Sequence, residues 1–215
     1  EILALASRPG FNPNDFSHYT DNQRRNRAVS IIYEPGSTFK SVVVATALEE
    51  KVVRPEEIFN DTGKVIINGQ AIHNWDGKGA GNIPFGDIIK NSVNTGFVQV
   101  GMRLGAAKLS AAADKFGFGK PTGIELPGEE NGMLLKAEDM RDIDVATMSI
   151  GQSIAVTPLQ LITAVAAIAN NGVLVKPHLI KEVRYMDGTL ERKIETEVVR
   201  RVISLEVAKE TQLLL

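Results

Sequence analysis

The sequence predicts a mixed fold of the α/β (α+β) class in which helices dominate. Two observations predict the helical part: residues 37–50 and 159–170 each form a long apolar stretch with helix start signals at its beginning. A third predicts antiparallel strands, because the turn pairs Asn68-Gly69 and Asp187-Gly188 are typical of β-hairpins. A length of 215 residues accommodates one large domain or two small ones.

The first fifty residues are predicted to contain a strand, a polar surface segment and a central helix. Residues 2–6 are predicted to form a buried strand, and the polar residues 17–30 are expected on the surface. The helix at 37–50 follows a Pro35-Gly36 turn and is apolar nearly all round, which is typical of a helix at the centre of a domain. It contains three consecutive valines of modest helix propensity, so tertiary packing must hold it helical.

The remaining elements follow from turn and capping signals. Thr157 and Pro158 begin the helix at 159–170, and Gly172 lies just past its end; its alanines allow close packing against the helix at 37–50. The other predicted elements are a hairpin at 64–72, helices at 84–90, 97–104, 108–116 and 138–149, a turn-rich loop at 120–129, strands at 173–183 and 184–193, and a final helix over 200–215.

Composition excludes several classes of function. The chain is 43% hydrophobic and 23% charged with a formal net charge of −2, and no long Lys/Arg run is present, so nucleic-acid binding is not expected. Cysteine is absent, which excludes disulfides and thiolate zinc sites. The longest apolar stretch, 159–169, is too short to cross a membrane. Both ends of the chain are apolar, and we expect it to be a piece of a longer protein.

The segment at 34–40 (EPGSTFK) places Ser37 and Lys40 three residues apart, on one face of the predicted helix start. A serine hydroxyl becomes a nucleophile when a nearby base takes its proton, and burial lowers the pKa of a lysine enough for it to be that base. The helix N-terminus favours developing negative charge. A helix-capping serine and an exposed lysine fit the same spacing, so the tetrad alone leaves both interpretations open.

A polar turn at 91–96 lies between two predicted helices and offers a second hydroxyl and an amide. If the turn is extended, Ser92 and Asn94 point the same way. Taken alone, this segment is also an ordinary loop, since Ser-x-Asn is a short pattern.

Taken together, the segments resemble the transpeptidase domain of penicillin-binding proteins, most closely the class B enzymes of division and sporulation. The resemblance covers nearly the whole chain, in the family's order. The segments that carry it are RAV at 27–29, EPGSTFK at 34–40, NSVNT at 91–95, FGKPTGIELPGE at 118–129, SIGQSIAVTPLQ at 149–160 and ANNG at 169–172.

The resemblance implies a fold and a set of roles. The expected fold is that of penicillin-binding proteins and serine β-lactamases, mostly helical here. Ser37 would attack the D-Ala-D-Ala carbonyl of a peptidoglycan stem peptide and would be acylated by β-lactams. Lys40 would be the base, Ser92 would relay a proton towards the leaving group, and Asn94 would bind the substrate amide and Lys40. No metal or organic cofactor is implied.

The family's third motif, Lys-Thr/Ser-Gly on a strand, has no counterpart at the expected place. The tetrad 120–123 (KPTG) is similar, but it carries an inserted proline and precedes the 149–172 blocks. We therefore expect 1–215 to be a partial transpeptidase domain with an incomplete antiparallel sheet, lacking an N-terminal anchor, a non-catalytic domain and C-terminal strands. The chain by itself is then expected to be catalytically impaired and to self-associate through an exposed sheet edge.

The resemblance places the parent protein at the extracytoplasmic face of the bacterial membrane, with division or elongation partners. Two alternatives to a transpeptidase remain: a penicillin-recognising sensor or serine β-lactamase-like protein, and a non-catalytic interaction scaffold. For His73 and Trp75, in the loop after the first hairpin, packing or surface exposure is favoured over a substrate role, because spacing places no partner near them.

Overall fold

Helix α3 (Lys40–Glu49) lies at the centre of a helical body, as its apolar composition predicts. In this computed structural model, which describes residues 1–215, every side chain from Val42 to Leu48 is buried. Helices α5 (Asn94–Lys115), α7 (Pro158–Ala169) and α8 (Leu205–Leu214) all pack against α3. The β-branched residues of α3 are therefore held helical by their neighbours.

The chain enters α3 through a tighter turn. Residues Gly36–Phe39 form the 3₁₀-helix η2, and α3 continues directly from it. The smaller helical elements are η1 (Pro13–His18), α1 (Asp21–Arg24), α2 (Arg27–Ser30), α4 (Phe85–Lys90), η3 (Ala137–Asp139) and α6 (Asp142–Met148).

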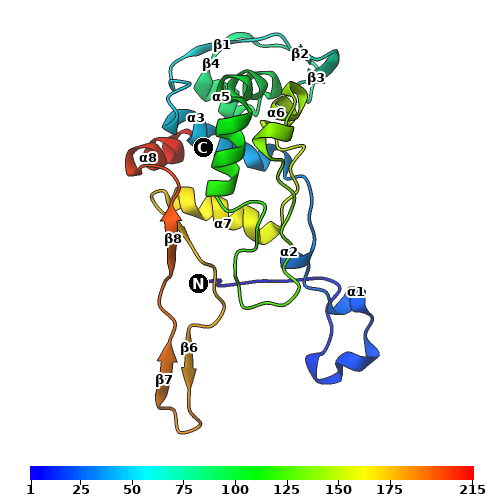
Figure 1. Cartoon of the computed structure of the whole chain (residues 1–215), viewed down its shortest axis with the longest axis vertical. Coiled ribbons are helices and arrows are strands. Elements are labelled where there is room, and N and C mark those ends of the chain that lie inside the picture. Colours follow the sequence, from blue (N-terminus) through cyan, green and yellow to red (C-terminus); the bar gives the residue numbers. More distant parts are fainter.

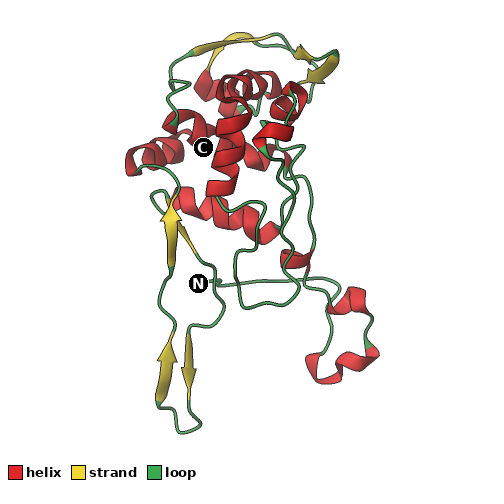
Figure 2. Ribbon diagram, viewed as in Figure 1, coloured by secondary structure: helices red, strands yellow, loops and turns green.

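The strands form four separate two-stranded antiparallel ladders, which lie at the two ends of the helical body (Figures 1 and 2). The β6–β7 ladder extends away from the helices. The pairs are β1 (Ile58–Asp61) with β4 (Gly81–Pro84), β2 (Lys64–Ile67) with β3 (Gln70–His73), β5 (Val173–Val175) with β8 (Val198–Arg201), and β6 (Glu182–Arg184) with β7 (Leu190–Lys193).

Both hairpins predicted from turn residues are present, but the continuous strand predicted at 173–183 is wrong: β5 pairs with β8, and only β6 pairs with β7. The β2–β3 turn has positive φ at Asn68 (49°) and at Gly69 (80°), the backbone that this residue pair favours. The β6–β7 turn contains Asp187-Gly188. The helices predicted at 84–90 and 159–170 are also present, and Thr157 caps α7 by accepting a hydrogen bond from the Gln160 N–H.

Several predicted boundaries are wrong. Residues 2–6 form no strand, because they make a single backbone hydrogen bond, from Ile2 to His178, and Leu3 is 90% exposed. The final helix begins only at Leu205, capped by Ser204, because the residues before it pair as β8 with β5. The helix predicted over 138–149 is split into η3 and α6.

The two helices predicted at 97–104 and 108–116 form one element, α5, interrupted at Gly105 (φ 71°, ψ 170°). Strands β1 and β4 were missed, because neither carries a hairpin signal of its own: the β2–β3 hairpin is inserted between them. None of the helices is long and apolar enough to cross a bilayer.

A close approach between α5 and α6 yields a stability prediction. A Cβ at Gly101 would lie 2.4 Å from the Ser149 Cβ, whereas a Cβ at Gly86 in α4 would meet nothing within 4 Å. Replacing Gly101 by alanine should therefore destabilise the fold by about 1–3 kcal/mol through overpacking. Replacing Gly86 by alanine should stabilise the fold by up to about 1 kcal/mol, because alanine lowers the conformational entropy of the unfolded chain.

Chemical denaturation of both variants beside the parent chain would measure these free energies of unfolding. Equal stabilisation by the two alanines would contradict the close α5–α6 contact.

Candidate active site

Ser37 lies in the η2 turn, and its hydroxyl is exposed at the surface. Its Oγ accepts a hydrogen bond from the Ser92 hydroxyl at 3.0 Å. The nucleophile predicted from the sequence is therefore both accessible and joined to a second predicted site residue, although Ser92 is 55 residues away in the chain.

A segment after α6 holds the Ser37 turn from the other side. The Gly36 N–H donates to the Gly151 carbonyl at 2.9 Å, and the Ser153 N–H donates to the Glu34 carboxylate at 2.9 Å. Gly151 has a φ of +79°, and a Cβ there would lie 1.9 Å from the Gly36 carbonyl oxygen. Only glycine fits this contact, which explains the glycine at position 151 of the SIGQS sequence at 149–153.

Lys40 is almost fully buried, with 4% of its surface exposed. Its Nζ donates to the Ser92 carbonyl oxygen at 2.8 Å, the Ser92 Oγ at 3.0 Å and the Asn94 Oδ1 at 2.7 Å. The same nitrogen lies 4.9 Å from the centre of the Phe97 ring, within reach of a cation–π interaction. These contacts use all three donors of the ammonium group.

Burial lowers the pKa of Lys40 from 10.5 to about 8, because the charged form loses its water. About a tenth of the lysines then carry a neutral amine at pH 7, far more than for an exposed lysine. No direct hydrogen bond joins Lys40 to Ser37: the link runs through the Ser92 hydroxyl. In place of the direct Ser37–Lys40 contact that the sequence suggests, three side chains form a hydrogen-bonded series in which Ser92 lies between Lys40 and Ser37.

The turn that carries Ser92 and Asn94 is not extended, so the condition under which the sequence pointed both side chains the same way is not met. Ser92 has a φ of +53°, and Asn94 is already the first residue of α5. Both side chains nevertheless meet at Lys40. The Asn94 amide also donates from Nδ2 to the His73 carbonyl oxygen at 2.9 Å, which ties the site to the end of β3.

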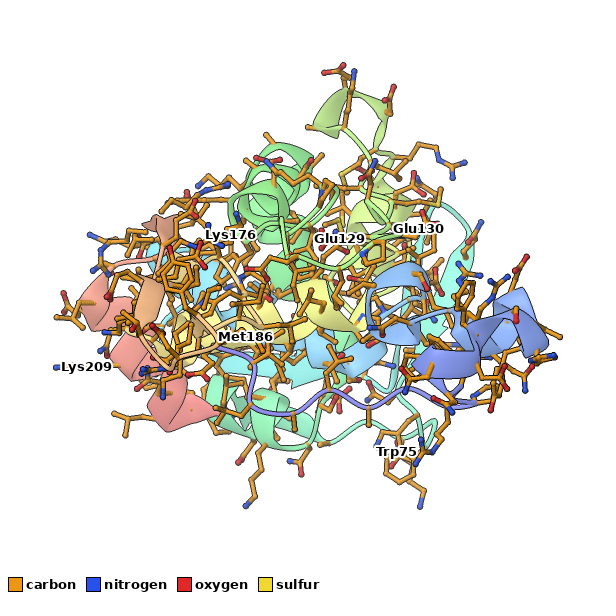
Figure 3. The ribbon with its side chains drawn as sticks, turned by 90° about the horizontal axis from the view of Figure 1, so that it is seen from below. Trp75, Glu129, Glu130, Lys176, Met186 and Lys209 are labelled. Atoms are coloured by element: carbon orange, nitrogen blue, oxygen red, sulfur yellow. The ribbon has the colours of Figure 1, made fainter.

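The KPTG tetrad at 120–123 takes no part in this site. Lys120 pairs with Asp114 at 2.6 Å, and the Thr122 hydroxyl donates to Glu129 at 2.5 Å. Trp75 is 84% exposed and projects from the surface (Figure 3), while His73 contributes only its backbone carbonyl to the site. No group of three or more His, Asp and Glu side chains is arranged to hold a metal ion.

Sequence reasoning missed the buried polar residues behind Asn94. Asp61, Asn74 and Thr95 form a hydrogen-bonded cluster next to His73 and Asn94. The only sequence signal for this cluster was the position of Thr95 inside the NSVNT segment. No spacing rule relates Asp61 to Asn74, since the β2–β3 hairpin separates them.

Comparison with known proteins agrees with this geometry. The family model "Penicillin binding protein transpeptidase domain" matches residues 1–215. Stage V sporulation protein D of Bacillus subtilis is 38% identical over 215 residues, covering 98% of this chain and 33% of that protein. Peptidoglycan D,D-transpeptidase FtsI of Escherichia coli K12 is 33% identical over 205 residues, covering 95% and 34%. The chain spans about a third of the length of these curated relatives.

Solved structures agree as well. The D,D-transpeptidase domain of a peptidoglycan glycosyltransferase from Eggerthella lenta superposes with a TM-score of 0.88 at 28% identity, over 98% of this chain and 56% of that chain. Penicillin-binding protein 3 of Mycobacterium tuberculosis, in complex with aztreonam, superposes with a TM-score of 0.83 at 30% identity, over 94% of this chain and 45% of that chain. These likenesses confirm the predicted α+β transpeptidase fold. The chain belongs to the penicillin-binding protein transpeptidase domain family.

Proposed function

We propose that this chain is the nucleophile-bearing part of a peptidoglycan D,D-transpeptidase, which cross-links stem peptides through an acyl-enzyme on Ser37. The observation that carries the proposal is the hydrogen-bonded series from Lys40 Nζ to Ser92 Oγ to Ser37 Oγ. The names of the Escherichia coli and Bacillus subtilis relatives support a role in cell-wall synthesis at division or sporulation.

The hydrogen-bond inventory of Lys40 supports a direction for the proton. When Lys40 loses its proton, one of its three contacts must donate to the nitrogen lone pair. The Ser92 carbonyl and the Asn94 Oδ1 can only accept, so the Ser92 hydroxyl is the group that reverses. Ser92 Oγ then becomes free to accept from the Ser37 hydroxyl, and the proton of Ser37 passes through Ser92 to Lys40.

Acyl transfer follows from that arrangement. The Ser37 Oγ attacks the penultimate D-Ala carbonyl carbon, and the Ser37 backbone N–H, in the first turn of η2, offers a hydrogen bond to the resulting oxyanion. Lys40, now protonated, returns the proton through Ser92 to the nitrogen of the departing D-Ala. The amine of a second stem peptide then attacks the ester carbonyl carbon and gives up a proton through Ser92 to Lys40. The bond from the carbonyl carbon to Ser37 Oγ breaks, and the proton returns by the same route to Ser37 Oγ. Asn94 keeps one N–H and one lone pair for the substrate amide.

The setting of the parent protein is part of the same proposal. Its substrate lies outside the cytoplasmic membrane, so the domain would act at the extracytoplasmic face, held there by an N-terminal anchor and working with division or elongation partners. We also propose that the chain by itself self-associates, since strands β5 and β8 each leave one edge unpaired. A sedimentation run giving only a monomer would contradict self-association.

Penicillin should acylate this chain at Ser37. Intact-mass analysis after incubation with benzylpenicillin should reveal an adduct of one drug molecule, absent from Ser37→Ala. Ser41→Ala is the matched control, because Ser41 lies one turn further and bonds only to the Thr38 carbonyl; its adduct should remain. We expect slow acylation, since the family's Lys-Thr/Ser-Gly strand would supply the second oxyanion donor, and the lack of one such donor lowers rates by roughly 10²–10³.

An equal adduct on Ser37→Ala, or none on a folded parent chain, would contradict the proposed chemistry for this chain. The lifetime of the adduct separates the alternatives: a stable ester favours a transpeptidase or a sensor, whereas rapid release of hydrolysed drug favours a β-lactamase.

The acylation rate should rise with pH and level off above pH 8. The reactive form of Lys40 is the neutral amine, and burial lowers the pKa of this lysine to about 8. Below that pH the rate should therefore rise about tenfold per unit, as the neutral fraction does. Stopped-flow fluorescence with a fluorescent penicillin, from pH 6 to pH 9.5, measures the profile. A rate that is flat across pH 7–9 would exclude Lys40 as the base.

A further inference from the structure

Asp61 is a buried carboxylate without a basic partner. It lies at the end of β1, is 3% exposed, and forms no ion pair. Its Oδ1 accepts from the Gly63 N–H (2.9 Å), the Asn74 Nδ2 (2.8 Å) and the Thr95 hydroxyl (2.6 Å), and its Oδ2 accepts from the Ala80 N–H (2.8 Å). Four donors from separate parts of the chain thus converge on one side chain.

This carboxylate is ionised. Burial by itself raises the pKa of Asp61, but the hydrogen bonds from Thr95, Ala80, Gly63 and Asn74 outweigh burial and hold the pKa below its usual value. An ionised carboxylate only accepts hydrogen bonds, so it fixes the direction of every group around it. Asn74 must turn its Nδ2 towards Asp61, and its Oδ1 then accepts from the Thr95 N–H at 3.1 Å.

Two neighbouring pairs of residues connect this cluster to Lys40. In the first pair, the Thr95 N–H donates to the Asn74 side chain. The second pair consists of the residues directly before these two: the Asn94 Nδ2 donates to the His73 carbonyl. A carbonyl can only accept, so the Asn94 amide nitrogen faces His73 and its oxygen faces Lys40. The position of residues 73–74 against the start of α5 thus sets the orientation of the Asn94 amide, whose oxygen must face Lys40.

We propose that Asp61 is a positioning residue for the reaction. Through Asn74 and Thr95 it holds the Asn94 amide in the orientation that accepts from Lys40, and so keeps the base aimed at Ser92. A buried charge without a basic partner is a poor device for stability alone, because it loses its water without gaining an ion pair. The acylation test of this inference rests on the proposed function; a second test does not.

The Thr95 hydroxyl offers a clean perturbation. Thr95→Val keeps the side-chain shape but removes the donor to Asp61, whereas Thr95→Ser retains the donor. Thr46→Val is the matched control: Thr46 is also buried, but its hydroxyl donates within α3 to the Val42 carbonyl, away from the site. Asp61→Asn is a second, independent variant, because it opposes the Ala80 N–H with a donor or leaves Asn74 without its acceptor.

Three quantities would be measured on the 215-residue chain: the melting temperature, the rate of acylation by a fluorescent penicillin, and the solvent-exchange rate of the Asn94 side-chain amide by ¹⁵N NMR. In Thr95→Val we expect acylation of the folded protein to slow by about ten- to a hundredfold, the scale of a small misplacement. Asn94 exchange should quicken several-fold. Thr95→Ser should restore both rates, and Thr46→Val should lower the melting temperature without changing either.

If folded Thr95→Val is acylated at the rate of the parent chain and its Asn94 amide exchanges at the parent rate, the inference is overturned. Failure of both Thr95→Val and Asp61→Asn to fold while Thr46→Val folds would also overturn it, since the cluster would then serve folding alone. If the parent chain is not acylated at all, the proposed function fails for this chain, and Asn94 exchange still decides the positioning role.

Discussion

The burial of the Lys40 ammonium is the constraint on which the site depends. A buried cation is tolerated only when its donors are satisfied, and all three acceptors come from Ser92 and Asn94. The start of α5 must therefore meet the start of α3 in one arrangement. Ser92 has a φ of +53°, and its carbonyl and its hydroxyl both accept hydrogen bonds from the same nitrogen.

Ser37, the proposed nucleophile, is held from the opposite side by backbone rather than by charge. Gly151 packs directly on Gly36 and accepts its N–H, so the loop after α6 fixes the position of the η2 turn. Ser37 lies between this backbone clamp and the polar contacts of Ser92, with its hydroxyl open to solvent. A rigid scaffold around one exposed hydroxyl is the preorganisation that acyl transfer requires.

Much of this could be predicted from the sequence, for physical reasons that differ between elements. Helix α3 and the β2–β3 turn are specified by local signals: an apolar stretch behind Pro35-Gly36, and Asn68-Gly69. Ser37, Lys40, Ser92 and Asn94 lie in recognisable short segments, and the structure brings all four together. The strand predicted at residues 2–6 failed because a strand needs a neighbour, which an apolar run does not specify. Asp61 was missed for the same reason, since its role arises only from tertiary contacts.

Lys40 is subject to two opposing demands, and the polarity of its neighbours reconciles them. Burial lowers its pKa and so increases the fraction of neutral amine near pH 7, but in the proposed role of a base the amine also needs its lone pair aimed at the correct proton. Two of its partners, the Ser92 carbonyl and the Asn94 Oδ1, can only accept hydrogen bonds, so they orient the two N–H groups of the neutral amine. The lone pair of the nitrogen then points at the third partner, the Ser92 hydroxyl. Any residue that keeps the Asn94 oxygen in place therefore contributes to the direction of proton transfer without touching the proton. In this chain that dependence extends through Asn74 and Thr95 to a carboxylate at the end of β1.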